Sequence, residues 1–251
     1  QTAGIIYQAA HSGAHVSVCF ATNGEYASEA DAAVRTAESR SVLAALGVPA
    51  EQIYFLGYPD TGMPYEESFL RRLYDGCRVS ASRWGRTETW RPDGQDFHFM
   101  RSGCHSTYTA ASVLRDLSDV LALVNPDTVY VTAPGDCHGD HDALGRFTTQ
   151  AVAAMENPPA LYYYLIHADR TDIWPERDAE RFRLPPMAAD HPLLRCAAER
   201  RPLPDGFPPA EKYSLIQSYT SQDPAAYNGY LLAFAKNDEL VFRVERLPSR
   251  T

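Results

Sequence analysis

Apolar and polar residues follow two different periods along the chain, and segments of the two kinds succeed one another in turn. Apolar residues at helical spacing predict helices over residues 2–12, 28–46, 108–124, 142–155 and 209–222. Short apolar or alternating runs typical of strands are HVSVCFAT, QIYFLG, TVYVTA, ALYYYLIHA and ELVFRVERL. Because strands and helices alternate, we predict an α/β fold with a mostly parallel sheet and helices on both of its faces.

The chain opens on a predicted helix, which ends at Gly13, and not on a strand. In a βαβ unit such a helix follows a strand, and ligands bind at the carboxyl ends of the strands. The first residue is Gln1 rather than Met, and no charged segment followed by an apolar one stands at the start. We therefore expect a first strand, and with it half of a binding site, to lie ahead of Gln1.

Two stretches lack sustained periodicity. Residues 77–107 are rich in Arg, Gly, Ser and Trp and are predicted to make a long excursion over the surface. Residues 174–209 hold many prolines and are interpreted as an arm or extended loop. Neither stretch marks a domain boundary, and the 251 residues fit a single domain.

Composition and charge exclude some partners. Acidic residues outnumber basic ones by 32 to 23, whereas a protein that neutralises phosphates needs a basic face, so nucleic acid is not an expected partner. No run of about 18 apolar residues is present, so no transmembrane segment is expected. Hydrophobic residues make up 45% of the chain, which is enough to fill a core.

The five cysteines are scattered and include no C-x-x-C pair. Cys77 and Cys104 both lie in the irregular stretch 77–107, where they form a disulfide if the protein is exported or stay free thiols otherwise, and both alternatives remain open. The unusual chain start and the long loops favour an extracytoplasmic location, and nothing else in the sequence bears on the compartment.

The segment Cys137-His138-Gly139-Asp140-His141 lies between a predicted strand and a predicted helix, where parallel-sheet enzymes place their chemistry. Two histidines three residues apart at a helix start can point to one side, so that one binds a metal and the other handles protons. Asp140 is placed to fix the tautomer of a neighbouring imidazole. The alternative is a polar loop with a capping Asp140 and two surface histidines.

Other polar residues carry weaker signals. Asp60 lies in a loop after a predicted strand and could belong to a mere turn. Arg35 and Glu38 are one helical turn apart and could form only a surface pair. Several histidines lack ligand spacing: His98, His105, His167 and His191. Of these, His105 is expected to face solvent.

Five segments, taken in order, resemble the LmbE/PIG-L family of zinc-dependent N-acetylglucosaminyl deacetylases: VSVCFATNGE, AVRTAES, LGVPAEQIYFLGYPDTGM, VYVTAPGDCHGDHDAL and EKYSLIQSYTSQ. The resemblance implies a Rossmann-like α/β fold and a single deacetylase domain over residues 1–251. The family's Ala-His-Pro-Asp-Asp-Glu segment, which follows its first strand, is absent here and would end a few residues before Gln1. The domain is therefore expected to lack the N-terminal strand and the metal-binding segment.

The resemblance also implies roles for individual residues. Zinc, or another divalent metal, would be held by His141 together with two further ligands upstream of Gln1. His138 would stabilise the oxyanion and protonate the departing amine, with Asp140 as its supporting carboxylate. Arg35, Asp60 and Met63 match positions that shape the sugar pocket, and Asp136 stands where some relatives carry an aromatic residue.

These roles agree with the chemistry of amide hydrolysis. The reaction needs a nucleophile that zinc-activated water supplies, a positive partner for the oxyanion and an acid for the amine. His138 suits the last two roles if its pKa lies near the ordinary histidine value.

We therefore predict a zinc-dependent N-deacetylase, a hydrolase of carbon–nitrogen bonds that removes an acyl group, with acetyl expected, from an amino sugar or its conjugate. The expected partner is that small-molecule substrate, and no oligomeric state is predicted. Two alternatives remain: a non-catalytic carbohydrate-binding relative that lost the upstream segment in evolution, and an amidase of a thiol-sugar conjugate.

Overall fold

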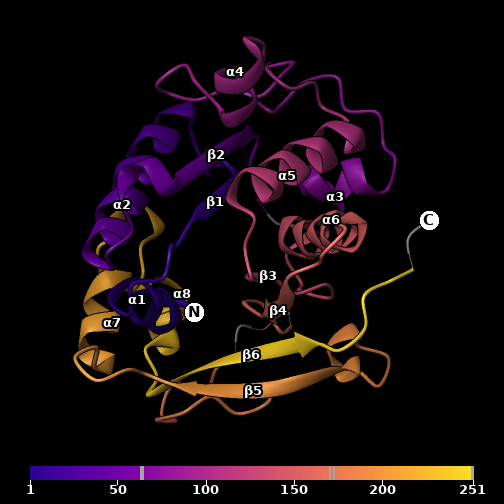
Figure 1. Cartoon of the computed structure of the whole chain (residues 1–251). Helices are drawn as coiled ribbons and strands as arrows, with labels where there is room; N and C mark the ends of the chain where they lie inside the picture. Colours follow the sequence, from indigo (N-terminus) through magenta and orange to yellow (C-terminus); the bar gives the residue numbers. More distant parts are fainter. Residues whose placement is uncertain (63–64, 170, 172, 250–251) are drawn as a thin grey trace.

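The strands form two separate sheets in the computed structural model, which describes residues 1–62, 65–169, 171 and 173–249 (Figure 1). The first sheet pairs β1 (Val18–Thr22) with β2 (Ile53–Tyr58) in parallel. The second has the order β3-β4-β6-β5. Its strands are β3 (Thr128–Thr132), β4 (Ala160–Tyr164), β5 (Cys196–Pro202) and β6 (Asp238–Val244).

The prediction of a mostly parallel sheet is wrong, because the four-stranded sheet is mixed. β3 and β4 are parallel, but β6 runs antiparallel to both β4 and β5. β5 exposes alternate residues and carries Glu199, Arg200 and Arg201, which an antiparallel edge strand tolerates and a parallel strand buried on both faces does not. Among the described residues β1 pairs only with β2 and β3 only with β4, and the expected first strand stays a prediction.

The helices confirm the predicted alternation with the strands. They are α1 (Ala3–His11), α2 (Glu29–Ala45), α3 (Phe69–Tyr74), α4 (Phe97–Ser102), α5 (Ala110–Val124), α6 (Gly139–Ala154), α7 (Pro209–Gln217) and α8 (Ala226–Gly229). In Figure 1, α3, α5 and α6 form one group, and they pack against each other around a buried cluster that includes Leu70, Leu117 and Val152. No helix among the described residues is both long and apolar enough to span a bilayer.

Helix α6 begins earlier than predicted, at Gly139 rather than at residue 142. The side chain of His138 caps it by accepting a hydrogen bond from the backbone N–H of Asp140. Gly139 is required here, because a Cβ would lie 2.5 Å from the carbonyl oxygen of Tyr65. Asp140 and His141 therefore lie in the first turn of a helix, which fixes their directions, and not in a loop.

Residues 77–107 do not form the predicted excursion over the surface. The stretch includes α4, and Thr89, Trp90, Asp96 and Phe97 are buried. The chain packs onto the end of β2, where the N–H of Trp90 donates to the carbonyl of Gly57 and a Cβ on Gly57 would lie 2.6 Å from the carbonyl oxygen of Trp90. Buried polar side chains help to form the interior of this stretch. A pattern of apolar residues alone does not predict them.

Two further predictions for the irregular stretches are corrected. Residues 174–209 contain β5 and the buried side chains of Trp174 and Phe182, so they form part of the core and not an arm. His105 is half-buried rather than solvent-facing, because its Nδ1 lies 2.5 Å from a carboxylate oxygen of the buried Asp96. All five cysteines are free, so Cys77 and Cys104 form no disulfide.

Two buried tyrosines predict a loss of stability in alkali. Burial, and then the charge of Asp116, raise the pKa of Tyr58 well above its ordinary value, and burial raises that of Tyr108. An unfolded tyrosine releases its proton near pH 10, so the native state binds more protons above that pH and the free energy of unfolding falls as pH rises. We expect a slope of about 1.4 kcal/mol per pH unit for each tyrosine. Denaturant unfolding of Tyr108→Phe at pH 9 to 11 should show a smaller slope, and an unchanged slope would contradict the assignment.

Candidate functional site

Polar residues gather where four strands end. Glu25 follows β1, Asp60 follows β2, the segment 136–141 follows β3 and His167 follows β4. The carboxyl ends of strands are where ligands bind in open α/β sheets. The site is thus formed by the short loops that follow these strands. The strands fix where each loop begins.

Asp60, His138 and Asp140 form the one group of metal-capable side chains found among the described residues. One possible ligand atom from each lies within 4.8 Å of the others. Asp140 is buried, whereas Asp60 and His138 are half-buried. Their nitrogen and oxygen atoms are of the kinds that bind zinc, and His138 joins such a site only when its Nε2 carries no proton.

Asp140 carries a buried oxygen that lacks a partner. Its Oδ1 accepts a hydrogen bond from the N–H of Leu70 at 2.7 Å, but its Oδ2 has no hydrogen-bond partner. Burial, followed by the negative charge of Asp60, raises the pKa of Asp140 to about 8. Burial and the charge of Asp60 make the ionised form of Asp140 unfavourable, and a cation beside its carboxylate would stabilise that form. The chemistry of this carboxylate therefore fits a metal ion.

His141 presents one ring nitrogen to the site. Its Nδ1 lies 3.2 Å from Oδ1 of Asp136, a fully buried carboxylate, and the ring stacks on His138 with 4.5 Å between centroids. Burial acts to lower the pKa of His141, but Asp136 outweighs it and the pKa is raised. Because Nδ1 donates to Asp136, the lone pair of the neutral ring is on Nε2, which is the nitrogen available to a metal.

Asp136 is held by the backbone as well as by His141. Its Oδ2 accepts from the N–H groups of Ile166 and His167 at 2.9 and 3.0 Å, and its Oδ1 accepts from that of His138 at 2.9 Å. Burial acts to raise its pKa, but the His141 ring, followed by the charge of His167 and the N–H of His138, outweighs burial and lowers the pKa. The carboxylate that orients an imidazole here is therefore that of Asp136, whereas Asp140 contacts His138 through its backbone N–H.

His138 has the opposite tautomer to His141. Its Nδ1 accepts the N–H of Asp140 at 3.3 Å, so the proton of the neutral ring is on Nε2. Burial, and then the neighbouring His141 and His167, lower the pKa of His138 to about 3. The expectation of a pKa near the ordinary histidine value is wrong, because the ring is buried beside two other imidazoles.

The residues predicted to shape a sugar pocket are partly brought together. Nη1 of Arg35 lies 3.6 Å from Oδ2 of Asp60, while Oδ1 of Asp60 accepts the N–H of Gly62. Met63 lies outside the described residues. Glu38 does not form a surface pair with Arg35 alone, because its carboxylate accepts hydrogen bonds from Thr220 and Ser221.

Three neighbours of the site were not predicted. Besides Asp136, Glu25 is fully buried, and its Oε2 accepts the N–H of Asp60 at 3.1 Å. His167 stacks between His141 and Tyr230 at centroid distances of 5.5 and 5.4 Å. Glu25 and Asp136 follow predicted strands, and His167 lies near the end of the predicted strand ALYYYLIHA. These positions do not distinguish the three from ordinary residues at strand ends.

Comparison with known proteins identifies related sequences and folds. The sequence profile of the family described as "PIG-L: GlcNAc-PI de-N-acetylase" matches residues 1–152, which is more than half of the chain. No curated protein matches the chain.

Three solved structures resemble the fold. The N,N'-diacetylchitobiose deacetylase from Pyrococcus horikoshii, complexed with an inhibitor, matches with a TM-score of 0.51 and 18% identity over 91% of this chain and 69% of its own. A zinc-inhibited form of teicoplanin deacetylase matches with a TM-score of 0.56 and 15% identity over 96% of this chain and 91% of its own. A triple mutant of a deacetylase from the teicoplanin biosynthetic pathway gives 0.56 and 13% over 96% and 90%.

Proposed function

Because the chain belongs to the PIG-L family, we propose that it is a metal-dependent N-deacetylase that removes an acyl group, with acetyl expected, from an amino sugar or its conjugate. One observation carries the proposal. Two stacked histidines at the start of α6 have opposite tautomers, one with a free Nε2 lone pair and the other with an Nε2 proton. This division suits one ring to hold a metal and the other to donate a hydrogen bond.

His141 is the metal ligand in this proposal. The carboxylate of Asp136 fixes its ring and increases the basicity of Nε2, as carboxylates do for metal-bound histidines. The family resemblance implies two further ligands besides His141, and in this proposal residues 1–251 form a single deacetylase domain. When bound, a zinc ion supplies Lewis-acid activation of water for attack on the amide carbonyl.

His138 stabilises the charge that develops on the carbonyl oxygen. Its neutral ring donates from Nε2, and its orientation is fixed by the hydrogen bond that Nδ1 accepts from the N–H of Asp140. A donor held in place before the reaction needs no reorganisation during it, which is the usual source of oxyanion stabilisation. The leaving amine also needs a proton, and the attacking water releases one. His138 delivers it from Nε2 in the protonated form of the ring, which the negative charge of the oxyanion favours.

Arg35 and Asp60 bind hydroxyl groups of the sugar. Their side chains are 23% and 14% exposed, and each keeps capacity for hydrogen bonds beyond their mutual ion pair. Glu25 positions this pair by accepting the N–H of Asp60. The names of the similar structures, a chitobiose and a teicoplanin deacetylase, and the description of the family support a sugar-containing substrate.

The direct test is acetate release by the full-length protein, including any residues encoded ahead of Gln1. Purified protein supplied with zinc should release acetate from an N-acetylglucosaminide, and a chelator should stop the release. Binding of the sugar without acetate release would instead support a carbohydrate-binding protein. Cleavage of a thiol-sugar amide in place of the acetamide would support an amidase.

A further inference from the structure

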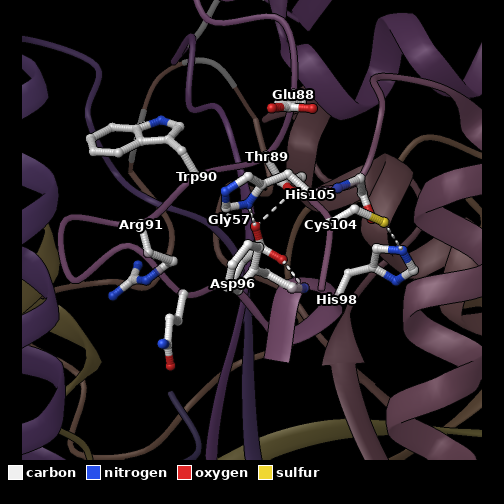
Figure 2. A network of polar contacts seen from close by, with 12 residues as sticks. Gly57, Glu88, Thr89, Trp90, Arg91, Asp96, His98, Cys104 and His105 are labelled. Atoms are coloured by element: carbon white, nitrogen blue, oxygen red, sulfur yellow. Dashed lines mark hydrogen bonds and ion pairs between the residues drawn. The ribbon is translucent and has the colours of Figure 1, made fainter. Parts of the chain in front are cut away.

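A cysteine, a histidine and an aspartate form a chain of contacts away from the site described above. Sγ of Cys104 lies 3.9 Å from Nε2 of His98, and Nδ1 of His98 lies 3.3 Å from Oδ1 of Asp116. Figure 2 shows the thiol and the imidazole facing each other. Cys104 lies in the turn after α4, His98 lies in the first turn of α4, and Asp116 lies in the middle of α5.

The aspartate fixes the direction of the histidine's proton. Asp116 is fully buried, and its oxygens accept from Tyr58 Oη at 2.7 Å, from Ser106 Oγ at 2.6 Å and from the guanidinium of Arg115. Nδ1 of His98 lies 3.3 Å from Oδ1 of this carboxylate. Because the negative charge of Asp116 favours an N–H on the side of the ring that faces it, we place the ring proton on Nδ1. The lone pair of the neutral ring is then on Nε2 and faces the thiol.

The backbone holds the thiol beside the ring. Gly103 ends α4 in the left-handed conformation with φ of 76°, and the turn brings Cys104 back toward His98. Ser102 Oγ lies 3.4 Å from Sγ of Cys104, and Asp96 caps the start of α4. Cys104 is exposed, whereas the side chain of His98 is only 13% exposed, so solutes reach the sulfur while the base stays fixed.

We propose that Cys104 is a nucleophilic thiol, with His98 as its base and Asp116 as the group that orients the base, and that it forms mixed disulfides with low-molecular-weight disulfides. The thiol proton moves to Nε2 of His98, and Sγ attacks one sulfur of the incoming disulfide. A new S–S bond to Cys104 forms as the incoming S–S bond breaks, and the released thiolate takes the proton from His98. Cys104 is oxidised and the leaving thiol is reduced, so the exchange balances.

The chain provides matched controls. Cys77 is also exposed, and within the described part of the chain its thiol has no hydrogen-bond partner. Cys19 stays unreactive, because burial and then the charge of Asp116 raise its pKa to about 12. Cys137 and Cys196 are half-buried and stay in both variants, so Cys77→Ser and Cys104→Ser compare the two exposed thiols against the same background.

The test is the rate of exchange with the aromatic disulfide dithiobis(nitrobenzoate), followed by release of nitrothiobenzoate from folded protein. At neutral pH we expect Cys104 in Cys77→Ser to react about 10-fold or more faster than Cys77 in Cys104→Ser. The variant Cys77→Ser/His98→Gln should react at the Cys77 rate. Equal rates for the two cysteines, or an undiminished rate after His98→Gln in protein with native circular dichroism, would overturn the proposal.

The pH dependence of the exchange rate is a second test, and it requires no substitution of His98. A base-assisted thiol keeps its reactivity as pH falls from about 8 to 7, whereas an unassisted thiol loses most of it over that unit. We expect the flatter profile for Cys104 and the steeper one for Cys77. Parallel profiles would overturn the proposal even if His98→Gln failed to fold.

Discussion

Replacing His141 with alanine is expected to abolish tight zinc binding by the full-length protein and to lower kcat/KM for an N-acetylglucosaminide by roughly 10³-fold, which is about 4 kcal/mol of transition-state stabilisation. The imidazole offers Nε2 because Asp136 occupies Nδ1 at 3.2 Å. Alanine removes the donor and leaves Asp136 buried beside an empty space. Bound zinc and initial rates, measured on the same samples, check the prediction.

Two variants separate the role of His141 from that of its neighbours. Asp136→Asn should weaken zinc binding by about 10- to 100-fold, because it removes the carboxylate that orients the ring. His138→Gln should lower kcat while zinc stays bound, because His138 acts as a donor and not as a ligand. Loss of zinc in His138→Gln together with its retention in His141→Ala would instead place the ion among Asp60, His138 and Asp140.

A surface histidine provides the control for these substitutions. His15 is exposed and lies outside the site, so His15→Ala should bind zinc and release acetate as the unaltered protein does. A similar loss in His15→Ala would show that the effect is not specific to the imidazole at position 141.

The convergence of distant segments could be predicted from the sequence, because it follows from strand direction. Asp60 and His138 are far apart in the chain, yet each follows a strand, and the structure brings them together with Asp140. The pairing of Asp136 with His141 could not be predicted, since it depends on how the loop after β3 turns. Asp140 is adjacent to His141 in the sequence, so it is the carboxylate that the sequence favours as the partner of a histidine. In the structure its carboxylate accepts the N–H of Leu70 instead.

The elements of the fold likewise fall into those that the sequence predicts and those that it does not. Strong periodicity predicted α2, α5 and the strands β2, β3 and β4. β5 was missed because its pattern of Ala, Glu and Arg is that of an exposed edge, and its pairing with β6 supplies the stabilisation that the sequence signal lacks. The interior of residues 77–107 was missed for a related reason, because polar contacts such as that between Asp96 and Thr89 organise it.

Two ion pairs, one buried and one exposed, lead to a second prediction of a large effect, this time on the free energy of unfolding. Nζ of Lys212 on α7 lies 2.7 Å from Oε2 of Glu239 on β6, and both side chains are 1% exposed. Arg86 and Glu29 lie at the same 2.7 Å but are 45% and 38% exposed. Equal distances at different burial isolate the effect of solvent.

Lys212→Met is expected to lower the free energy of unfolding by about 3–5 kcal/mol, because it leaves the carboxylate of Glu239 buried without its cation. Glu29→Gln should change it by less than about 1 kcal/mol, since water screens the exposed pair. The double variant Lys212→Met/Glu239→Gln should be more stable than Lys212→Met, because it removes the uncompensated charge while Gln still accepts the N–H of Gly4. Denaturant unfolding measures all three. If Lys212→Met and Glu29→Gln lost similar stability, burial would not be the cause, and the contact between α7 and β6 would depend on apolar packing alone.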